Sequence, residues 1–387
     1  MRGTYTKLCL GAFVAAILVV PSFALVQHAK AEGESWTIAL YVNGDNDLER
    51  YWADYSLPGL LNIPASSDVN IVAFMDWVAQ NGTVLYEISG GSITVVDTYG
   101  EMNYGDGATF EWFLTETATL YPSDNLAVVG WDHGYAWRYF SDDQTSNDEI
   151  TMPELQAAIE DAGVYIDILA FDACNMAAVE VMYQVELTGL VGILVGSEET
   201  IPMNGYPYDL MFTPVANDPS RTPAQVATDM VDGWETYYDP LNWAQSVCLS
   251  ATDIVSFGSQ TSALFDWCGA MHDNLGAYER EYKKVVRDTY TMYATSKHVD
   301  LEDLCINLLA NSKIKDATLR AAAQDVIDLV DSSVIAYWNG PYSAACGGIS
   351  LYWGTGGDWP YSGPAYVSEV AFAIDTGWGD FLDDYNS

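Results

Sequence analysis

Residues 166–176 read Ile-Asp-Ile-Leu-Ala-Phe-Asp-Ala-Cys-Asn-Met, and this stretch decides the fold. Its short, mostly apolar first part follows a helix-like segment at 157–163, which predicts a buried strand of a parallel sheet. A second helix is expected to begin at once after Cys174, because one helical face is apolar at Ala178, Val181, Met182 and Val185. Cys174 is therefore expected between the end of a strand and the start of a helix.

This place in the fold favours chemistry at Cys174. Active sites of open α/β sheets gather at the carboxyl ends of the strands. The unpaired N–H groups and the dipole at the start of a helix also favour a thiolate. The alternative is a buried and inert cysteine, which is a common state of free cysteines.

The rest of the chain predicts an α/β fold. Apolar runs indicate strands at 36–43, 69–77, 126–131 and 189–196, and the segments 83–89 and 92–98 around Gly90-Gly91 indicate a hairpin. Strands that alternate with helices predict a largely parallel sheet covered on both faces. After about residue 222 the patterns are mainly helical (222–238, 253–287, 299–312 and 317–338), and a late strand is expected at 347–353.

The amino-terminal residues have the pattern of an export signal. Arg2 and Lys7 accompany the apolar run 8–20, and Ala29-Lys30-Ala31 offers the small residues of a cleavage site. The alternative is an uncleaved membrane anchor, but no later run is long and apolar enough to span a bilayer. We expect a signal peptide at 1–31 and a mature protein that is secreted.

The net charge of the chain excludes some classes of partner. Residues 1–31 hold three basic residues and no acidic one, so their removal changes the net charge from −40 to −43. This charge argues against nucleic acid or an anionic membrane as a partner.

The odd number of remaining cysteines in an exported chain predicts two disulfides and one free thiol, Cys174, with three pairings open for Cys248, Cys268, Cys305 and Cys346.

Two strand ends are expected to meet. The strand at 126–131 runs into His133-Gly134, and the next strand runs into Cys174. A thiolate and an imidazole form the minimal apparatus of a cysteine hydrolase, and the N–H groups of Gly134 and Cys174 would form an oxyanion hole. The alternative is a structural histidine.

These residues lie in stretches that resemble the clostripain-like cysteine peptidases, relatives of caspases, gingipains and legumains. The resemblance covers nearly the whole mature chain, at residues 41–49 (YVNGDNDLE), 100–106 (GEMNYGD), 133–134 (HG), 171–176 (FDACNM), 196–205 (GSEETIPMNG) and 347–352 (GGISLY). It implies a caspase-like α/β/α sandwich with a mostly parallel central sheet, a catalytic core at 32–215 and a helix-rich region at 216–387 packed on that core.

The resemblance also implies roles for individual residues. His133 would be the catalytic histidine and Cys174 the nucleophile, while Asp172 would lie at the floor of the S1 pocket and select Arg or Lys. The alternative for Asp172 is a carboxylate satisfied by backbone N–H groups. Ser197 and Glu198 would also bind substrate, and for Glu198 and Glu199 the alternative is a solvated pair in a loop. The substrate would be a peptide or protein, with neither a cofactor nor a metal expected; some relatives respond to calcium, but no EF-hand loop is present.

The chain also departs from the family pattern. Asn175 replaces an apolar residue after the nucleophile, and Tyr135 replaces a second glycine after Gly134. Arg138 is the only basic residue between His133 and Cys174. The loop at 141–149, which we expect to be flexible, contains no basic residue. The sequence therefore argues against activation by self-cleavage between the histidine strand and the cysteine strand. Two other functions therefore compete with the peptidase: a non-catalytic binding module on the same fold, and a metal-dependent hydrolase using Asp132, His133 and Asp172, although a single histidine rarely suffices for zinc.

Overall fold

A nine-stranded sheet forms the centre of the computed structural model, which describes residues 35–78, 82–244, 246–292 and 297–387. The order of its strands is β12-β10-β9-β8-β5-β1-β2-β3-β4. The five central strands are parallel neighbours: β9 (Val191–Gly196), β8 (Ile166–Asp172), β5 (Asn125–Trp131), β1 (Trp36–Gly44) and β2 (Val69–Trp77). The predicted signal peptide at 1–31 lies outside the described residues.

Antiparallel strands complete both edges of the sheet. On one side lies the predicted hairpin of β3 (Val84–Ser89) and β4 (Ser92–Thr98), in which Gly90 and Gly91 both have positive φ. On the other side lie β10 (Cys248–Asp253) and β12 (Val334–Asn339). The sheet thus extends beyond residue 215, since two of its strands come from the helix-rich part of the sequence.

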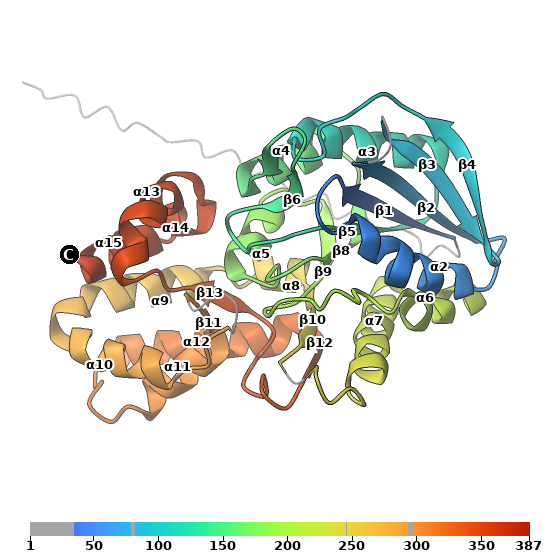
Figure 1. The fold of residues 1–387 in the computed structure, drawn as a ribbon. Coiled ribbons are helices and arrows are strands. Elements are labelled where there is room, and N and C mark those ends of the chain that lie inside the picture. Colours follow the sequence, from blue (N-terminus) through green and yellow to red (C-terminus); the bar gives the residue numbers. More distant parts are fainter. Residues whose placement is uncertain (1–34, 79–81, 245, 293–296) are drawn as a thin grey trace, which may run out of the picture.

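Helices cover both faces of the sheet (Figure 1). One face packs against α3 (Gly107–Leu120), α4 (Met152–Ala162), α5 (Val179–Glu186) and α8 (Ile254–Gly258). The other face packs against the π-helical segment Trp52–Ser56, which follows the short helix α1 (Glu49–Tyr51), and against α2 (Leu57–Asn62), α6 (Tyr208–Asn217) and α7 (Pro223–Tyr238). Side chains of β1 alternate between the two layers, with Tyr41 in one core and Leu40 in the other. The predicted α/β fold with a mostly parallel sheet is confirmed.

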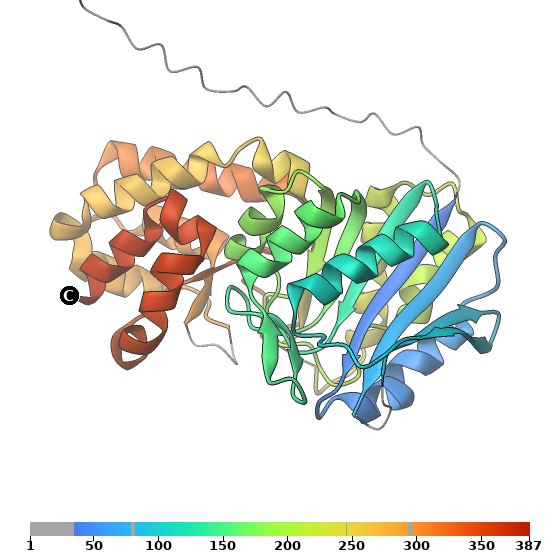
Figure 2. The same cartoon turned by 90° about the horizontal axis from the view of Figure 1, so that it is seen from above.

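The remaining helices gather beside the sheet at its β10–β12 end (Figures 1 and 2). They are α9 (Ser262–Asp273), α10 (Leu275–Asp288), α11 (Leu301–Ala310), α12 (Ala317–Ser333), α13 (Trp359–Glu369), α14 (Ala371–Asp375) and α15 (Trp378–Asn386). A short antiparallel pair, β11 (His298–Asp300) with β13 (Ser350–Tyr352), lies among them. Their apolar side chains continue the core of the α3–α5 face.

Three local predictions are wrong. The helix predicted at 317–338 ends at Ser333, because the β-branched and aromatic residues that follow pair with β10 as a strand. That partner strand, β10, was not predicted. The loop at 141–149 is an ordered hairpin of β6 (Phe140–Asp143) and β7 (Asp148–Ile150), not a flexible segment.

Candidate active site

The carboxyl ends of β5 and β8 bring the predicted dyad together. The two strands are parallel neighbours, with Trp131 opposite Asp172 in the register. The residues that follow them, His133 and Cys174, therefore leave the sheet side by side, and both line one small cavity of about 50 Å³. Asp172 and the segment from Ile201 to Gly205 complete much of its wall.

Cys174 is a shielded thiol. Burial raises its pKa to about 11, while the backbone N–H of Ile201 acts in the opposite direction and lies 3.3 Å from Sγ. The expected helix dipole is not available, because α5 begins only at Val179. The prediction that the helix starts directly after Cys174 is thus wrong, and the thiol needs a base to become a nucleophile.

Asn175 explains why the helix starts late. Its φ is +61°, a left-handed conformation that Asn tolerates better than apolar residues do. Its backbone N–H donates to the Glu199 carbonyl oxygen at 3.1 Å, and its Nδ2 donates to the Glu198 carbonyl oxygen at 2.6 Å. Asn175 therefore anchors the segment after β9 and does not line the cavity.

His133 is oriented by a residue that the sequence did not single out. Its Nε2 lies 2.9 Å from Oδ1 of Asp47, in the turn between β1 and α1. A carboxylate accepts, so Nε2 carries the proton in this contact and Nδ1 keeps the free lone pair. Asp47 belongs to the quoted stretch at 41–49, but nothing in its spacing pointed to the histidine.

The turn that carries Asp47 is itself held to the strand before His133. Asn46 donates from Nδ2 to Oδ1 of Asp132 at 2.7 Å, and Asp132 also accepts from the Asp142 N–H at 2.7 Å. Both oxygens of Asp132 thus have protein donors, and burial raises its pKa well above the usual value. Among the described residues, no cluster of potential metal ligands contains Asp132, His133 or Asp172, which gives the metal-hydrolase hypothesis no support.

Gly134 lies against Cys174. A Cβ atom built on Gly134 would approach the Cys174 carbonyl oxygen to 2.7 Å, so only glycine fits there. Within the described part of the chain, neither the Gly134 N–H nor the Cys174 N–H donates a hydrogen bond. Two unused donors beside the thiol are what an oxyanion hole requires.

Asp172 is a buried carboxylate held by neutral donors. The backbone N–H of Tyr206 and the hydroxyl of Tyr208 donate to its Oδ2 at 3.0 and 2.9 Å. Burial raises its pKa to about 7, and these two donors oppose the rise. Gly205, with φ of +63°, is needed beside it, since a Cβ there would lie 2.9 Å from the same oxygen.

Ser197 and Glu198 lie behind the cavity and not in its wall. Ser197 Oγ contacts Cys248 Sγ at 3.5 Å, and Glu198 Oε2 accepts from the Gly348 N–H at 3.0 Å. Glu199 is also buried, and its Oε1 accepts from the Tyr290 hydroxyl at 2.6 Å. The alternative of a solvated pair is wrong, and a role in substrate binding stays a prediction.

The predicted disulfides are absent from the described residues. All five cysteines from Cys174 onward are free thiols. Cys268 and Cys305 lie within the buried faces of α9 and α11, where each packs as a small apolar side chain. Cys248 and Cys346 share a small cluster with Met292, and their side chains are hydrogen-bonded to each other.

Arg138 does not lie in an open cleavage loop. Its guanidinium lies 5.0 Å from the ring centre of Tyr135 and 5.3 Å from that of Trp137. The following residues form the β6–β7 hairpin. Cleavage after Arg138 would therefore require this packing and the start of the hairpin to open.

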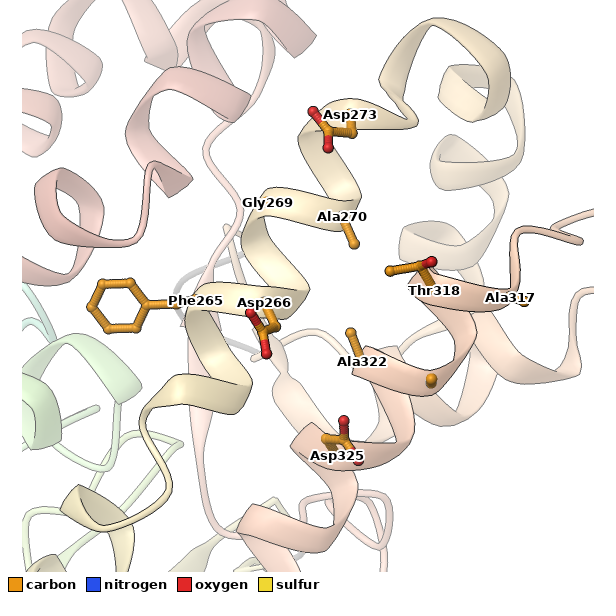
Figure 3. A pocket seen from close by; sticks show the side chains of 10 residues that line it. Phe265, Asp266, Gly269, Ala270, Asp273, Ala317, Thr318, Ala322 and Asp325 are labelled. Carbon is orange, nitrogen blue, oxygen red and sulfur yellow. The ribbon is translucent and has the colours of Figure 1, made fainter.

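A much larger hollow, of about 690 Å³, lies between α9 and α12. Figure 3 shows Asp266, Asp273 and Asp325 around it, together with the short side chains of Ala270 and Ala322. Its lining residues include no cysteine or histidine. The small cavity at the strand ends is therefore the candidate active site.

Comparison with protein families matches residues 40–384 to the clostripain family. A comparison with curated proteins gives no match. Among solved structures, a secreted C11 cysteine protease from Bacteroides thetaiotaomicron, bound to an irreversible peptide inhibitor, is 20% identical and has a TM-score of 0.66, covering 89% of this chain and 99% of that chain. An inactive zymogen C11 protease from Parabacteroides distasonis is 19% identical with a TM-score of 0.67, covering 88% and 97%.

These likenesses show a shared caspase-like fold, and the family match spans nearly all described residues. Among those residues, no helix combines the length and apolar character needed to cross a bilayer. The chain belongs to the clostripain family and is a cysteine-type peptidase, a hydrolase.

Proposed function

We propose that this peptidase is exported and cleaves peptide bonds after Arg or Lys, with Cys174 as nucleophile and His133 as acid and base. The observation that carries the proposal is Asp172, a buried carboxylate in the wall of the cavity that Cys174 and His133 also line. Its Oδ2 is occupied by Tyr206 and Tyr208, which leaves Oδ1 for a ligand. A guanidinium or ammonium group of the substrate would pair with this carboxylate through charge-assisted hydrogen bonds.

The chemistry follows from the neighbouring groups. Nδ1 of His133 takes the thiol proton, and Sγ of Cys174 attacks the scissile carbonyl carbon. The N–H groups of Gly134 and Cys174 donate to the oxygen that becomes negative. His133 then gives the proton to the leaving amine, and water hydrolyses the acyl-enzyme with the same imidazole as base.

The segment at 201–205 forms one side of the cavity. Met203 is 51% exposed at the rim, whereas Ile201 packs against the core and its N–H lies 3.3 Å from Sγ of Cys174. A substrate that reaches Sγ therefore has to displace this contact.

Export is supported by the amino-terminal pattern of Arg2, Lys7 and the apolar run 8–20. The related B. thetaiotaomicron protein is described as secreted. Cleavage after Ala31 would give a mature chain that begins at Glu32. Amino-terminal sequencing of the protein recovered outside the cytoplasm tests this, and a chain that keeps Met1 would contradict it.

Fluorogenic peptides with Arg, Lys, Asp or Leu at P1 test the activity. We expect hydrolysis after Arg and Lys that a thiol alkylator abolishes, and no hydrolysis by Cys174→Ala. Cys268→Ala is the matched control, because that thiol is buried in α9 outside the cavity, and it should retain activity. Full activity of Cys174→Ala would overturn the nucleophile, and no hydrolysis by any form would favour the non-catalytic binding module.

A further inference from the structure

Two of the free cysteines lie against each other outside the catalytic cavity. Cys248 is the first residue of β10, and Cys346 lies between β12 and β13, about 100 residues further along the chain. Their side chains pack together with that of Met292, and their sulfur atoms lie within 4.8 Å of each other. The two thiols are hydrogen-bonded to each other, and both residues are buried. The fold thus brings two distant thiols into contact.

Hydrogen bonds around the β10–β12 pair hold the two cysteines in this place. Cys248 lies opposite Asn339 in the antiparallel register, and Nδ2 of Asn339 donates to the Cys346 carbonyl oxygen at 2.6 Å. The Ser343 hydroxyl donates to the Val247 carbonyl oxygen at 2.9 Å. The segment that carries Cys346 is therefore tied both to the strand partner of Cys248 and to the residue before it.

The two thiols differ in how readily they lose a proton. Burial raises the pKa of Cys248, but hydrogen bonds to Cys346 and Ser197 outweigh burial, so that this pKa lies below its usual value. The hydrogen bond to Cys248, together with burial, raises the pKa of Cys346. In redox-active cysteine pairs, a thiolate of lowered pKa attacks a disulfide, and a second thiol beside it displaces the product.

We propose that Cys248 and Cys346 form a reversible disulfide, and that the structure describes the reduced form of this pair. The sulfur atoms of a disulfide lie about 2.05 Å apart, so the two sulfur atoms have to approach by less than about 3 Å. An exported chain, as proposed above, meets the oxidising surroundings in which disulfides form and persist.

The oxidant is a small disulfide such as oxidised glutathione. The Cys248 thiolate attacks one of its sulfur atoms, forms a mixed disulfide and releases one glutathione thiolate. The Cys346 sulfur, after losing its proton to solvent, attacks Sγ of Cys248 and releases the second glutathione thiolate. The pair loses two electrons and two protons, and the oxidant is reduced to two thiols.

The position of Cys346 gives the oxidant a route to the buried pair. Tyr342, four residues before Cys346, is 70% exposed, and Ala344 and Ala345 are exposed as well. The turn that covers Cys346 therefore lies at the surface, and local opening of this turn exposes the two sulfur atoms without unfolding the sheet.

The same atoms do not make a complete zinc site. Glu198 is the third potential ligand beside the two thiols, and its Oε2 already accepts from the Gly348 N–H at 3.0 Å. A structural zinc ion takes four ligands, whereas this cluster offers three among the described residues.

The other three thiols have different surroundings. Cys268 is hydrogen-bonded to Thr376 and lies within α9, and Cys305 lies within α11, where helical hydrogen bonds fix the backbone. Cys174 lines the catalytic cavity beside the Ile201 N–H. Of the five thiols, these three are expected to stay free.

The disulfide would stabilise the region behind the active site. Sγ of Cys248 contacts Oγ of Ser197 at 3.5 Å, and the Ser197 carbonyl oxygen accepts from the Ala177 N–H at 3.1 Å, three residues after Cys174. A disulfide that closes a long loop restricts the unfolded chain strongly. Oxidation of the pair should therefore raise Tm by about 5 °C.

Mapping of the thiols in the purified chain from Glu32 onward tests the pair without reference to peptidase activity or export. The protein is incubated with oxidised glutathione, denatured, alkylated, digested and analysed by mass spectrometry. We expect the Cys248 and Cys346 peptides to be joined, with the free thiols falling from five to three, and dithiothreitol to restore all five. Five alkylated cysteines after oxidation, or a link from Cys248 to a different cysteine, would overturn the proposal.

Variants connect the disulfide to stability. Cys346→Ala should lose the rise in Tm on oxidation, because Cys248 can then form only a mixed disulfide with glutathione, which its added mass identifies. Cys268→Ala is the matched control, as another buried thiol outside the pair, and should keep the rise. A full rise in Cys346→Ala, or its loss in Cys268→Ala, would contradict the assigned pair.

Discussion

Asp172 and Asp76 occupy equivalent places in the fold but have opposite surroundings. Each is a buried carboxylate at the carboxyl end of a parallel strand, and burial raises the pKa of one to about 7 and of the other to about 8. Asp172 faces two neutral donors, Tyr206 and Tyr208. The charged groups that raise the pKa of Asp76 are all carboxylates, and only the backbone N–H of Trp77 opposes the rise.

This difference bears on which of the two carboxylates can serve the proposed P1 pocket. Neutral donors hold one oxygen of Asp172 in place and leave a single charge for one organic cation, as a basic P1 side chain would supply. The same residue type at the same edge of the sheet thus has two different electrostatic environments.

The largest expected effect comes from the same substitution at both positions. Asp172→Asn should lower the ratio of kcat/KM for an Arg peptide to that for a Leu peptide about 100-fold or more, because it leaves the bound guanidinium buried without its counter-charge. Asp76→Asn should leave this ratio unchanged. Steady-state kinetics with the two peptides checks both, and an equal loss in both variants would show that the comparison is false.

The second effect is a pH dependence. Arg stays charged throughout, whereas Asp172, with a pKa of about 7, is mostly protonated at pH 5.5 and mostly ionised at pH 8. The Arg/Leu ratio of kcat/KM should therefore rise with pH, about 30-fold over this range. The parameter kcat/KM reports the ionisation of groups in the free enzyme, and the ionisation of His133 and Cys174 affects both substrates equally, so it cancels in the ratio. A ratio that is flat in the parent protein, or equally steep in Asp172→Asn, would contradict the role of Asp172.

The sequence predicts much of this arrangement, and its failures have physical causes. Uninterrupted apolar runs identify the parallel strands, the strand ends identify His133 and Cys174, and the resemblance to the clostripain-like peptidases adds Asp172. β10 is missed because its residues, CLSATD, are short and only partly apolar, and pairing with distant strands stabilises them. Asp47 could not be assigned because its contact with His133 depends on which side chains face it across the fold.

A third effect tests whether Asp47 positions His133 while Asp172 serves the pocket. Asp47→Ala removes the acceptor of His133 Nε2 and should lower kcat about tenfold with little change in KM, because the histidine loses its orientation but the pocket keeps Asp172. Asp54→Ala, at an exposed acidic position in the following helical segment, is the control and should be neutral. If Asp47→Ala raises KM and leaves kcat intact, Asp47 contributes to binding and not to positioning.

The smallest effect separates the two donors of Asp172. Tyr208→Phe removes a hydroxyl that lowers the pKa of Asp172, so this pKa should rise and the pH midpoint of the Arg/Leu ratio should move upward. At pH 7 the ratio should fall about threefold, the size expected for one hydrogen bond. Tyr206→Phe is the matched control, because the Tyr206 hydroxyl donates to the Phe171 carbonyl oxygen and only its backbone N–H reaches Asp172. A shifted midpoint in Tyr208→Phe alone would show that neutral donors set the charge of Asp172, whereas equal shifts in both variants would attribute the effect to general loosening of the pocket.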